Sequence, residues 1–383
     1  MKLSDIAEFV TDKISSSSIS LDSYVTTDSL LQNKRGRELA QNLPPMQCAL
    51  TNYKKGDVLV ANIRPYLKKV WFADSEGGCS SDVLAFRAKN GHCSSYLYTV
   101  LMQDAFFDYA MSGAKGSKMP RGDKDQIMRY ELPTFTPMEE ENIGNMLVDI
   151  MSKININRQI NDNLEAMAKQ LYDYWFVQFD FPNEEGKPYK SSGGAMVWNE
   201  KLKREIPQGW DFCFLENLLT IKNGRDHKHL ADGIYPVYGS SGEMRKASEY
   251  LYDGESVLMP RKGSLNNIMY VNEAFWTVDT MFYSEMKQSN CAKYIYYTIK
   301  DIDFTRWDSG TGVPSMTSST LYSIKLVKPQ SEILKKFDEV ISPLFEHMKQ
   351  ISEQDSVLTK QRDELIPLLM NGQASINYHL SAY

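Results

Sequence analysis

The sequence lacks the features that mark membrane-spanning, secreted and disulfide-stabilised proteins. It has no apolar run of about eighteen residues, and its first stretch, MKLSDIAEFVTDKI, carries Asp5 and Glu8 where a secretory signal has an apolar core. Its five cysteines are scattered and include no C-x-x-C pair. We therefore expect a cytoplasmic protein whose free thiols are small buried or half-buried residues, without a disulfide framework or a zinc site.

Catalytic signatures are also missing. The sequence contains no G-x-x-x-x-G-K-[ST] phosphate loop, no G-x-G-x-x-G fingerprint, no H-E-x-x-H pair and no G-x-S-x-G elbow. His227 and His229 lie close together in GRDHKH, but an i,i+2 pair on an expected loop is a weak metal signal. LPPM at 43–46 lacks both the acidic or amide residue and the final aromatic of the [DNS]-P-P-[YFW] motif that aminomethylating enzymes use on a flipped base. These absences predict a binding protein that is not an enzyme and holds neither a cofactor nor a metal.

Positive charge is not in excess. The 383 residues carry a net charge of −6, with 42% hydrophobic and 24% charged residues, as in an ordinary globular protein of two or three domains. A protein that simply coats nucleic acid is usually basic, so non-specific binding is not favoured by the total charge. Local basic patches can still bind phosphates.

What the sequence does contain is an internal repeat. The stretch NYKKGDVLVANIRPYLKKVWFADSEGGCSSDVLAF, which begins at Asn52, resembles YLYDGESVLMPRKGSLNNIMYVNEAFWTVDTMFY, which begins at Tyr250. Gly56 corresponds to Gly254, 198 positions later, and MSGAKGSKMP corresponds to DSGTGVPSMT further along. A period of this length predicts two similar globular parts.

A heptad pattern follows each copy of the repeat. Apolar positions alternate in steps of four and three from Ile143 to Trp175, and again from Phe337 to Leu369, which is the seam of a coiled coil. We expect two helices of about 38 residues, each ~57 Å long, that pair antiparallel. Four polar positions within the seam are expected to fix the register of the pair: Asn157, Asn161, Asp355 and Arg362.

These patterns predict an α+β fold. Two similar mixed α/β domains are joined and spaced by two long antiparallel coiled-coil helices in a pseudo-twofold arrangement. The expected segments are a first domain at 1–137, a first helix at 138–181, a linker at 182–205, a second domain at 206–330, a second helix at 331–371 and a tail at 372–383. Trp198 and Trp210 suggest that the linker region packs on the body of the protein.

The first helix ends in the aromatic stretch LYDYWFVQFDFP. Without a membrane span, these aromatics are expected as buried anchors, either at a joint within the chain or at a subunit interface. The residues expected to pack the helix pair and its partners are Leu164, Leu171, Trp175, Phe176, Leu358, Leu365 and Leu369.

Each globular copy carries basic residues beside glycines. Arg and Lys neutralise phosphates and read guanine edges, glycine allows backbone N–H groups to approach a phosphate, and Ser or Thr adds neutral donors. A solvated loop with ordinary surface charge is the alternative, but such loops recur at equivalent places, especially at 113–118 and 310–315. The candidate DNA-binding residues of the first copy are Arg64, Lys68, Lys69, Lys115, Ser117, Lys118, Arg121 and Lys124. Those of the second copy are Arg225, Lys228, Ser240, Arg245, Arg261, Lys262, Ser264, Thr311 and Ser315.

Over essentially its full length, the chain resembles the specificity (S) subunit of type I restriction–modification systems. The stretch 155–210 is similar to the central conserved region of that family, GIYPVYGSSGE and VLMPRKGS look like one class of its target recognition domains, and LTKQRDELIPLLMNGQASI looks like its closing helix. The resemblance is weak near residues 1–50.

The resemblance implies more than the residues alone do. Each globular copy would be a target recognition domain that reads one half of a bipartite, asymmetric site on double-stranded DNA, and the helix pair would set the number of unspecified bases between the halves. The chain would have no activity alone. It would assemble with two modification (methyltransferase) subunits, which bind S-adenosylmethionine and methylate adenine, and with restriction (endonuclease and translocase) subunits, which use ATP with Mg.

Two other functions remain to be weighed. A DNA methyltransferase with a built-in recognition domain would need S-adenosylmethionine and adenine-pocket motifs, which the sequence lacks. A coiled-coil scaffold protein that does not read DNA would explain the helices, but not the paired basic, glycine-rich loops.

Overall fold

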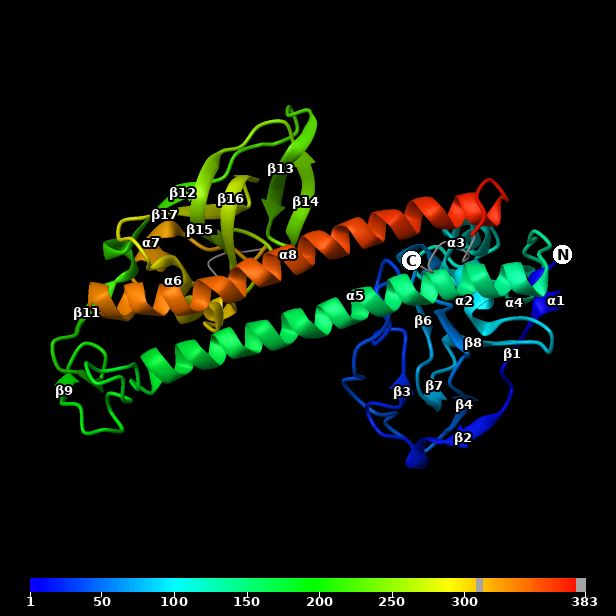
Figure 1. Cartoon of the computed structure of the whole chain (residues 1–383), viewed down its shortest axis with the longest axis horizontal. Coiled ribbons are helices and arrows are strands. Elements are labelled where there is room, and N and C mark those ends of the chain that lie inside the picture. The colour runs from blue at the N-terminus through cyan, green and yellow to red at the C-terminus, as the bar shows by residue number, and fades with distance from the viewer. Residues whose placement is uncertain (308–312, 377–383) are drawn as a thin grey trace, which may run out of the picture. The chain divides into compact units, whose positions relative to one another are not determined.

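The chain folds into two compact units. The computed structural model describes residues 1–307 and 313–376, so the candidate Thr311 lies outside the described residues. The first unit comprises Met1–Gln159 and Ser352–Tyr383, and the second comprises Ile160–Ile351. The two long helices are α5 (Pro137–Tyr172) and α8 (Ser331–Met370) (Figure 1). One part of each helix belongs to the first unit and the other part to the second. The fold is α+β with two long helices, as the sequence predicts.

The first unit contains two four-stranded sheets. The first has the order β1 (Ala7–Phe9), β8 (Val83–Ala88), β5 (Val58–Ala61), β6 (Val70–Phe72), and all its neighbours are antiparallel. The second has the order β2 (Lys13–Ser15), β4 (Ala49–Tyr53), β7 (Gly77–Cys79), β3 (Tyr24–Val25), with β3 and β7 parallel. The short helices of this unit are α1 (Leu3–Ile6), α2 (Ser94–Met102), α3 (Asp104–Ser112), α4 (Lys124–Ile127), η1 (Ser16–Ser18) and η2 (Pro65–Leu67).

Both faces of the first sheet are buried, as the uninterrupted apolar run in β5 indicates. Side chains alternate across a strand, so Val58 and Val60 join the core cluster that contains α2, α3 and parts of α5 and α8. Leu59 and Ala61 join the cluster that contains residues of the second sheet. β5 therefore lies between a helical layer and a second β layer.

The second unit contains a six-stranded sheet. Its order is β12 (Leu219–Asn223), β17 (Met281–Met286), β15 (Tyr252–Pro260), β16 (Met269–Thr277), β13 (Asp232–Gly239), β14 (Gly242–Ala247). β13 and β16 are parallel and the other neighbours are antiparallel. Two smaller pairs are β9 (Met196–Asn199) with β10 (Arg204–Pro207) and β11 (Asp211–Phe214) with β18 (Lys325–Lys328). The short helices are α6 (Ala292–Lys300), α7 (Ser318–Tyr322), η4 (Leu215–Asn217) and η5 (Phe304–Trp307).

The internal repeat is confirmed by the strands. The order β1-β8-β5-β6 in the first unit corresponds to β12-β17-β15-β16 in the second. β8 and β17 start at Val83 and Met281, and the following helices α2 and α6 start at Ser94 and Ala292, 198 positions apart in both cases. The same arrangement of four strands and a following helix therefore occurs in both units.

α5 begins with a capping box that the sequence encodes as T-P-x-E. The amide and hydroxyl of Thr136 donate to Glu139 Oε2 at 2.8 Å, and the Glu139 amide donates to Thr136 Oγ1 at 3.3 Å. Pro137 occupies the first helical position, where no hydrogen-bond donor is needed. The helix therefore starts where local chemistry satisfies its first amides.

The two long helices pair antiparallel within each unit. In the first unit, Leu147 and Ile154 of α5 share a core with Leu369 of α8, and Asn157 Nδ2 donates to Asp355 Oδ1 at 2.7 Å. In the second unit, the rings of Trp175 and Phe337 lie 5.6 Å apart. The heptad seam is thus buried or half-buried where the sequence predicts it, with a polar contact at Asn157.

The aromatic end of α5 is buried within the second unit. The helix widens into a π-turn, η3 (Asp173–Val177), and Phe179 then takes a left-handed conformation with φ of 65°. Trp175, Phe176, Phe179 and Phe181 are all buried, and Phe181 stacks on Trp210 with ring centroids 4.9 Å apart. The expected anchors therefore pack inside the chain. Among the helices of the described residues, none is long and apolar enough to cross a membrane.

Two expectations about single residues are wrong. Trp198 is 57% exposed because it lies in the two-stranded β9–β10 hairpin, where its indole N–H donates to Glu200 instead of packing on the body. Cys48 is exposed in the loop that precedes β4, although Cys79, Cys213 and Cys291 are buried and Cys93 is half-buried. Sequence spacing gives no information on either environment.

Candidate nucleic-acid interface

In the first unit, two basic segments distant in sequence meet at the end of β5. Arg64 and Lys68 both have left-handed backbones, with φ of 52° and 50°, and η2 lies between them. The Arg64 amide donates to the Pro120 carbonyl at 2.7 Å, and Ile63 forms an antiparallel bridge with Arg121. The structure therefore joins the RPYLKK segment to the loop of residues 113–124.

Several basic side chains of these segments already have partners. Lys68 Nζ lies 2.8 Å from Asp104, and Lys69 Nζ donates to the Thr27 carbonyl at 2.5 Å. Burial disfavours the ionised carboxyl of Asp104, but the ammonium groups of Lys34 and Lys68 outweigh burial and hold its pKa below the ordinary value. Lys69 thus has a structural contact, and Lys68 shares one carboxylate with a second lysine.

Other cations of the first unit are better placed for a ligand. Arg121 lies 2.7 Å from Asp82 and Lys115 lies 3.1 Å from Asp123, but both pairs are partly or largely exposed and can exchange partners at little cost. Four further candidates are exposed and form no ion pair among the described residues: the cations Arg64, Lys118 and Lys124, and the hydroxyl residue Ser117. The three cations Arg64, Lys118 and Lys124 are therefore the residues of the loop pair that are best placed to meet a phosphate.

The second unit repeats this junction. Lys262 forms an antiparallel bridge with Ser315, and the Gly263 amide donates to the Pro314 carbonyl at 3.0 Å. Gly263 has φ of 90°, and a side chain at this position would meet Ser240 Oγ, which lies 2.8 Å from the site of a Cβ. Four candidates, namely Ser240, Arg261, Lys262 and Ser315, are therefore brought together, and exposed Ser264 follows them directly.

A recess of about 260 Å³ opens beside this junction. Two cations and several neutral hydrogen-bonding groups line it, and the lining residues described include no carboxylate. They are Asn223, Arg261, Lys262, Phe282, Ser315, Met316, Thr317 and Ser318. Cations with amide and hydroxyl groups are the set that binds phosphates and base edges.

Arg245 occupies a different environment. Its Nη2 donates to the carbonyl oxygens of His227 at 2.6 Å and Leu230 at 2.9 Å, and its Nη1 lies 2.9 Å from Asp232. The guanidinium thus ties β14 to the loop that precedes β13. Arg225 and Lys228, on the same loop, are exposed.

Sequence reasoning missed part of the recess. Asn223, Thr317 and Ser318 were not among the candidates, although Asn223 lies two positions before the candidate Arg225 in NGRDHKH. In the first unit, Tyr66 and Met119 are about half exposed on the same loops as Arg64 and Lys118. Tyr66 and Met119 could have been found in the sequence, because each is an apolar residue that stands among basic residues.

The predicted packing residues lie along the helix pair. Leu164, Trp175, Phe176 and Leu369 are buried. Leu171 packs at the edge of the second-unit core, and Leu358 and Leu365 at the edge of the first-unit core.

Comparisons with known proteins agree on one family. The family described as "Type I restriction modification DNA specificity domain" matches residues 207–354. The chain is similar to the type I restriction enzyme MjaIX specificity subunit of Methanocaldococcus jannaschii, with 25% identity over 86% of this chain and 80% of that protein. It is also similar to the HindI specificity subunit of Haemophilus influenzae, with 20% identity over 84% of this chain and 87% of that protein.

A solved structure shares the fold. The type I restriction–modification S subunit from M. genitalium matches with a TM-score of 0.61 and 16% identity, over 98% of this chain and 96% of the other. The prediction of a binding protein agrees with relatives that are named as specificity subunits. Residues 207–354 thus match the DNA specificity domain of type I restriction–modification systems, and the chain as a whole is similar to specificity subunits of such systems over most of its length.

Proposed function

We propose that this chain is the DNA-reading subunit of a type I restriction–modification complex, and that each unit reads one half of a bipartite, asymmetric site on double-stranded DNA. The observation that carries the proposal is the repeated junction. In the first unit, the bridge Ile63–Arg121 joins the basic segment after β5 to a second loop, and in the second unit the bridge Lys262–Ser315 does the same after β15. A scaffold that does not contact DNA has no need for the same exposed polar junction in two places.

The proposed partners follow from the family. Two modification subunits would bind S-adenosylmethionine and methylate adenine on DNA that this chain selects, and restriction subunits would use ATP with Mg. This chain itself would hold no cofactor and would act in the cytoplasm. The paired helices would act as the spacer between the two half-sites.

The decisive experiment maps N6-methyladenine by single-molecule sequencing in cells that express this chain with its modification subunit. We expect a motif of two short defined blocks around a fixed unspecified gap. A continuous motif would contradict separate reading by two units, and a stable complex that binds no DNA would favour the scaffold.

The recess in the second unit can be tested by salt dependence. If Arg261 and Lys262 contact phosphates, the double variant Arg261→Gln/Lys262→Gln weakens DNA binding by the assembled complex and lowers the slope of log affinity against log salt concentration by about one for each lost contact. Lys203→Gln, on an exposed turn of the same unit, is the matched control and should leave the slope unchanged. Equal slopes in all three proteins would remove the recess from the DNA interface.

A further inference from the structure

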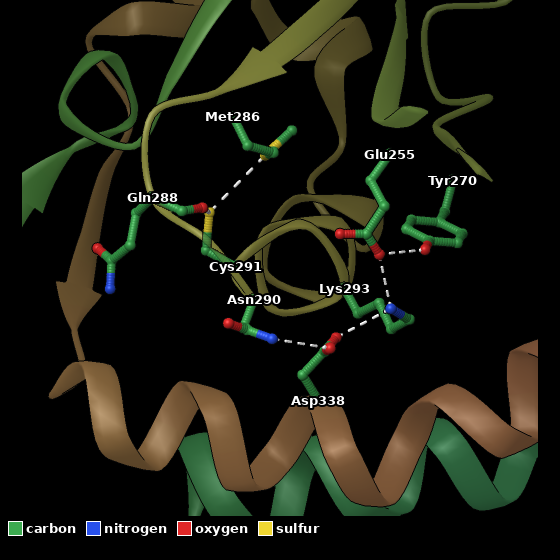
Figure 2. A network of polar contacts seen from close by, with 8 residues as sticks. All are labelled: Glu255, Tyr270, Met286, Gln288, Asn290, Cys291, Lys293 and Asp338. Atoms are coloured by element: carbon green, nitrogen blue, oxygen red, sulfur yellow. Dashed lines mark hydrogen bonds and ion pairs between the residues drawn. The ribbon is translucent and has the colours of Figure 1, made fainter. Parts of the chain in front are cut away.

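The second unit contains a buried lysine between two carboxylates from different elements. Lys293 of α6 is 5% exposed, and its Nζ lies 2.7 Å from Glu255 Oε1 on β15 and 2.9 Å from Asp338 Oδ1 on α8 (Figure 2). A buried ammonium group needs such partners, because an unpaired charge in an apolar core is costly. The ion pairs therefore link the sheet, α6 and α8 at one point.

Further polar and aromatic contacts fix this point. Tyr270 donates its hydroxyl hydrogen to Glu255 at 2.5 Å, and Asn290 Nδ2 donates to Asp338 Oδ2 at 3.1 Å (Figure 2). The ammonium group also lies 5.1 Å from the centroid of the Tyr270 ring. Each carboxylate thus has a second donor, so the geometry of the triad is strongly determined.

The other end of α6 is tied to the other long helix. Lys300 forms an ion pair with Glu165 of α5, and Tyr297 donates its hydroxyl hydrogen to Glu165 Oε2 at 3.2 Å. Burial works against the charged form of Lys300, but hydrogen bonding to Glu165 outweighs burial and raises its pKa. Lys293 and Lys300 lie two turns apart on the same face of α6, so one nine-residue helix contacts both α5 and α8 through charges.

The first unit shows that the fold does not require this arrangement. Ser95 of α2 occupies the position that Lys293 has in α6, and there α2 approaches Gly144 of α5 so closely that a Cβ on Gly144 would lie 2.3 Å from Ser95 Oγ and 2.5 Å from the Tyr96 amide nitrogen. In the first unit, close backbone packing thus holds α2 against α5, whereas in the second unit two ion pairs hold α6 to β15 and α8. The lysine is replaced by serine in the first unit, so the ion pairs of Lys293 have no counterpart at Ser95.

We infer that Lys293 and Lys300 are positioning residues that fix the orientation of the second globular domain on the two long helices, and thereby the gap length that the assembled complex accepts. The inference rests on the proposed function. Its physical basis is that buried ion pairs often add little stability relative to apolar replacements, but hold one geometry by directional contacts. Without them, the aromatic contacts remain and the domain can settle in neighbouring orientations.

The test replaces the triad by neutral residues of similar size. A complex of the modification subunits with Lys293→Met/Glu255→Gln/Asp338→Asn is given duplexes that carry the natural half-sites with the natural gap, one base pair less and one more. Lys203→Met, which removes an exposed charge of the same unit, is the control. We expect the parent and the control to methylate only the duplex with the natural gap. The triple variant should methylate the duplexes with the shorter and the longer gap at least about tenfold faster than the parent does. The base preferences in both half-sites should stay unchanged.

The outcomes separate this inference from the proposed function. If the parent complex has no bipartite preference, the proposed function fails. If the parent accepts one gap and the triple variant folds and accepts the same gap alone, the inference is overturned. The double variant Lys300→Met/Glu165→Gln provides a second test, because it changes a half-exposed ion pair and spares the core. An unaltered gap preference in this variant also counts against the inference.

Discussion

Arginine side chains that look alike in the sequence have different surroundings in this protein. Arg261 lines a recess of about 260 Å³ in which the described lining residues carry no acidic group, whereas Arg245 donates to two backbone carbonyls and lies beside Asp232. Backbone acceptors leave no signature in the sequence, so both were equal candidates for DNA binding. The structure favours a structural role for Arg245.

Arg245→Gln should therefore lower stability and leave the salt dependence of DNA binding unchanged. The substitution removes the charged donor that the carbonyl oxygens of His227 and Leu230 accept from. The free energy of unfolding should therefore fall by about 1–3 kcal/mol. Urea denaturation measures this change. Lys246→Gln, at the exposed neighbouring position, is the control and should stay within about 0.5 kcal/mol. A lowered salt slope with intact stability would place Arg245 on the DNA.

Asp104 gives the first unit a pH dependence. Because Lys34 and Lys68 hold its folded-state pKa below the value of about 3.9 found in unfolded chains, its carboxylate stabilises the fold above that value and the contribution is lost as the pH falls through the folded-state pKa. The melting temperature of Asp104→Asn should therefore lie below that of the parent protein between pH 5 and 7 by a constant amount, and the difference should shrink below about pH 4. Asp108→Asn, exposed on the same helix, should show no such difference. A difference that persists at the lowest pH would refute the ion-pair explanation.

At the scale of elements, the same strand–helix unit is joined to long helices in two ways. In the first unit, α2 lies against Gly144 of α5, where the atoms that a side chain would meet include the Tyr96 amide nitrogen. Backbone atoms cannot rotate away as the end of a flexible side chain can. The glycine is therefore required by packing, against its poor helix propensity.

Gly144→Ala should destabilise the protein although alanine is the better helix former. The gain in propensity is at most about 1 kcal/mol, whereas forcing α2 and α5 apart costs typically about 1–3 kcal/mol. Differential scanning calorimetry measures the shift in melting temperature. Adding Ser95→Gly removes the Oγ contact but not the contact with the Tyr96 nitrogen, so it should restore stability only in part. Full restoration would show that the side chain alone sets the approach.

Local patterns predicted elements well and contacts between elements poorly. The 198-residue offset and the heptad seam both depend on spacing along the chain, and both are present in the structure. The bridge between Lys262 and Ser315 joins segments more than fifty residues apart, so spacing could not reveal that the two candidate loops form one site. The burial of Lys293 could not be read either, because its partners come from β15 and α8.

At the scale of the whole molecule, α5 and α8 each pass from one unit into the other. The unit boundaries fall after Gln159 in α5 and after Ile351 in α8. Because each unit is compact by itself, we expect an insertion at both boundaries to keep the contacts within each unit. This offers a direct test of the proposed spacer.

Inserting one heptad after Gln159 and another after Ile351 should lengthen the accepted gap between half-sites by about three base pairs. Seven helical residues add ~10.5 Å, against ~3.4 Å for each base pair, and a full heptad keeps the seam in phase. Methylation mapping of the variant complex measures the gap, and the bases read in each half-site should not change. A heptad in α5 alone is the control and should lower stability, because the helices then lose their register. An unchanged gap in the double insertion would refute the spacer.

The division of the chain also has a consequence for its synthesis. The second unit is one continuous segment, so a nascent chain can complete it once Ile351 has left the ribosome. The first unit, although made earlier, shares its core with Ile366, Leu369 and Met370, which are translated after the second unit. The domain translated first is therefore the last to be completed, and a ribosome that stalls within α8 releases a chain whose N-terminal core has an open apolar face for chaperones and proteases to find.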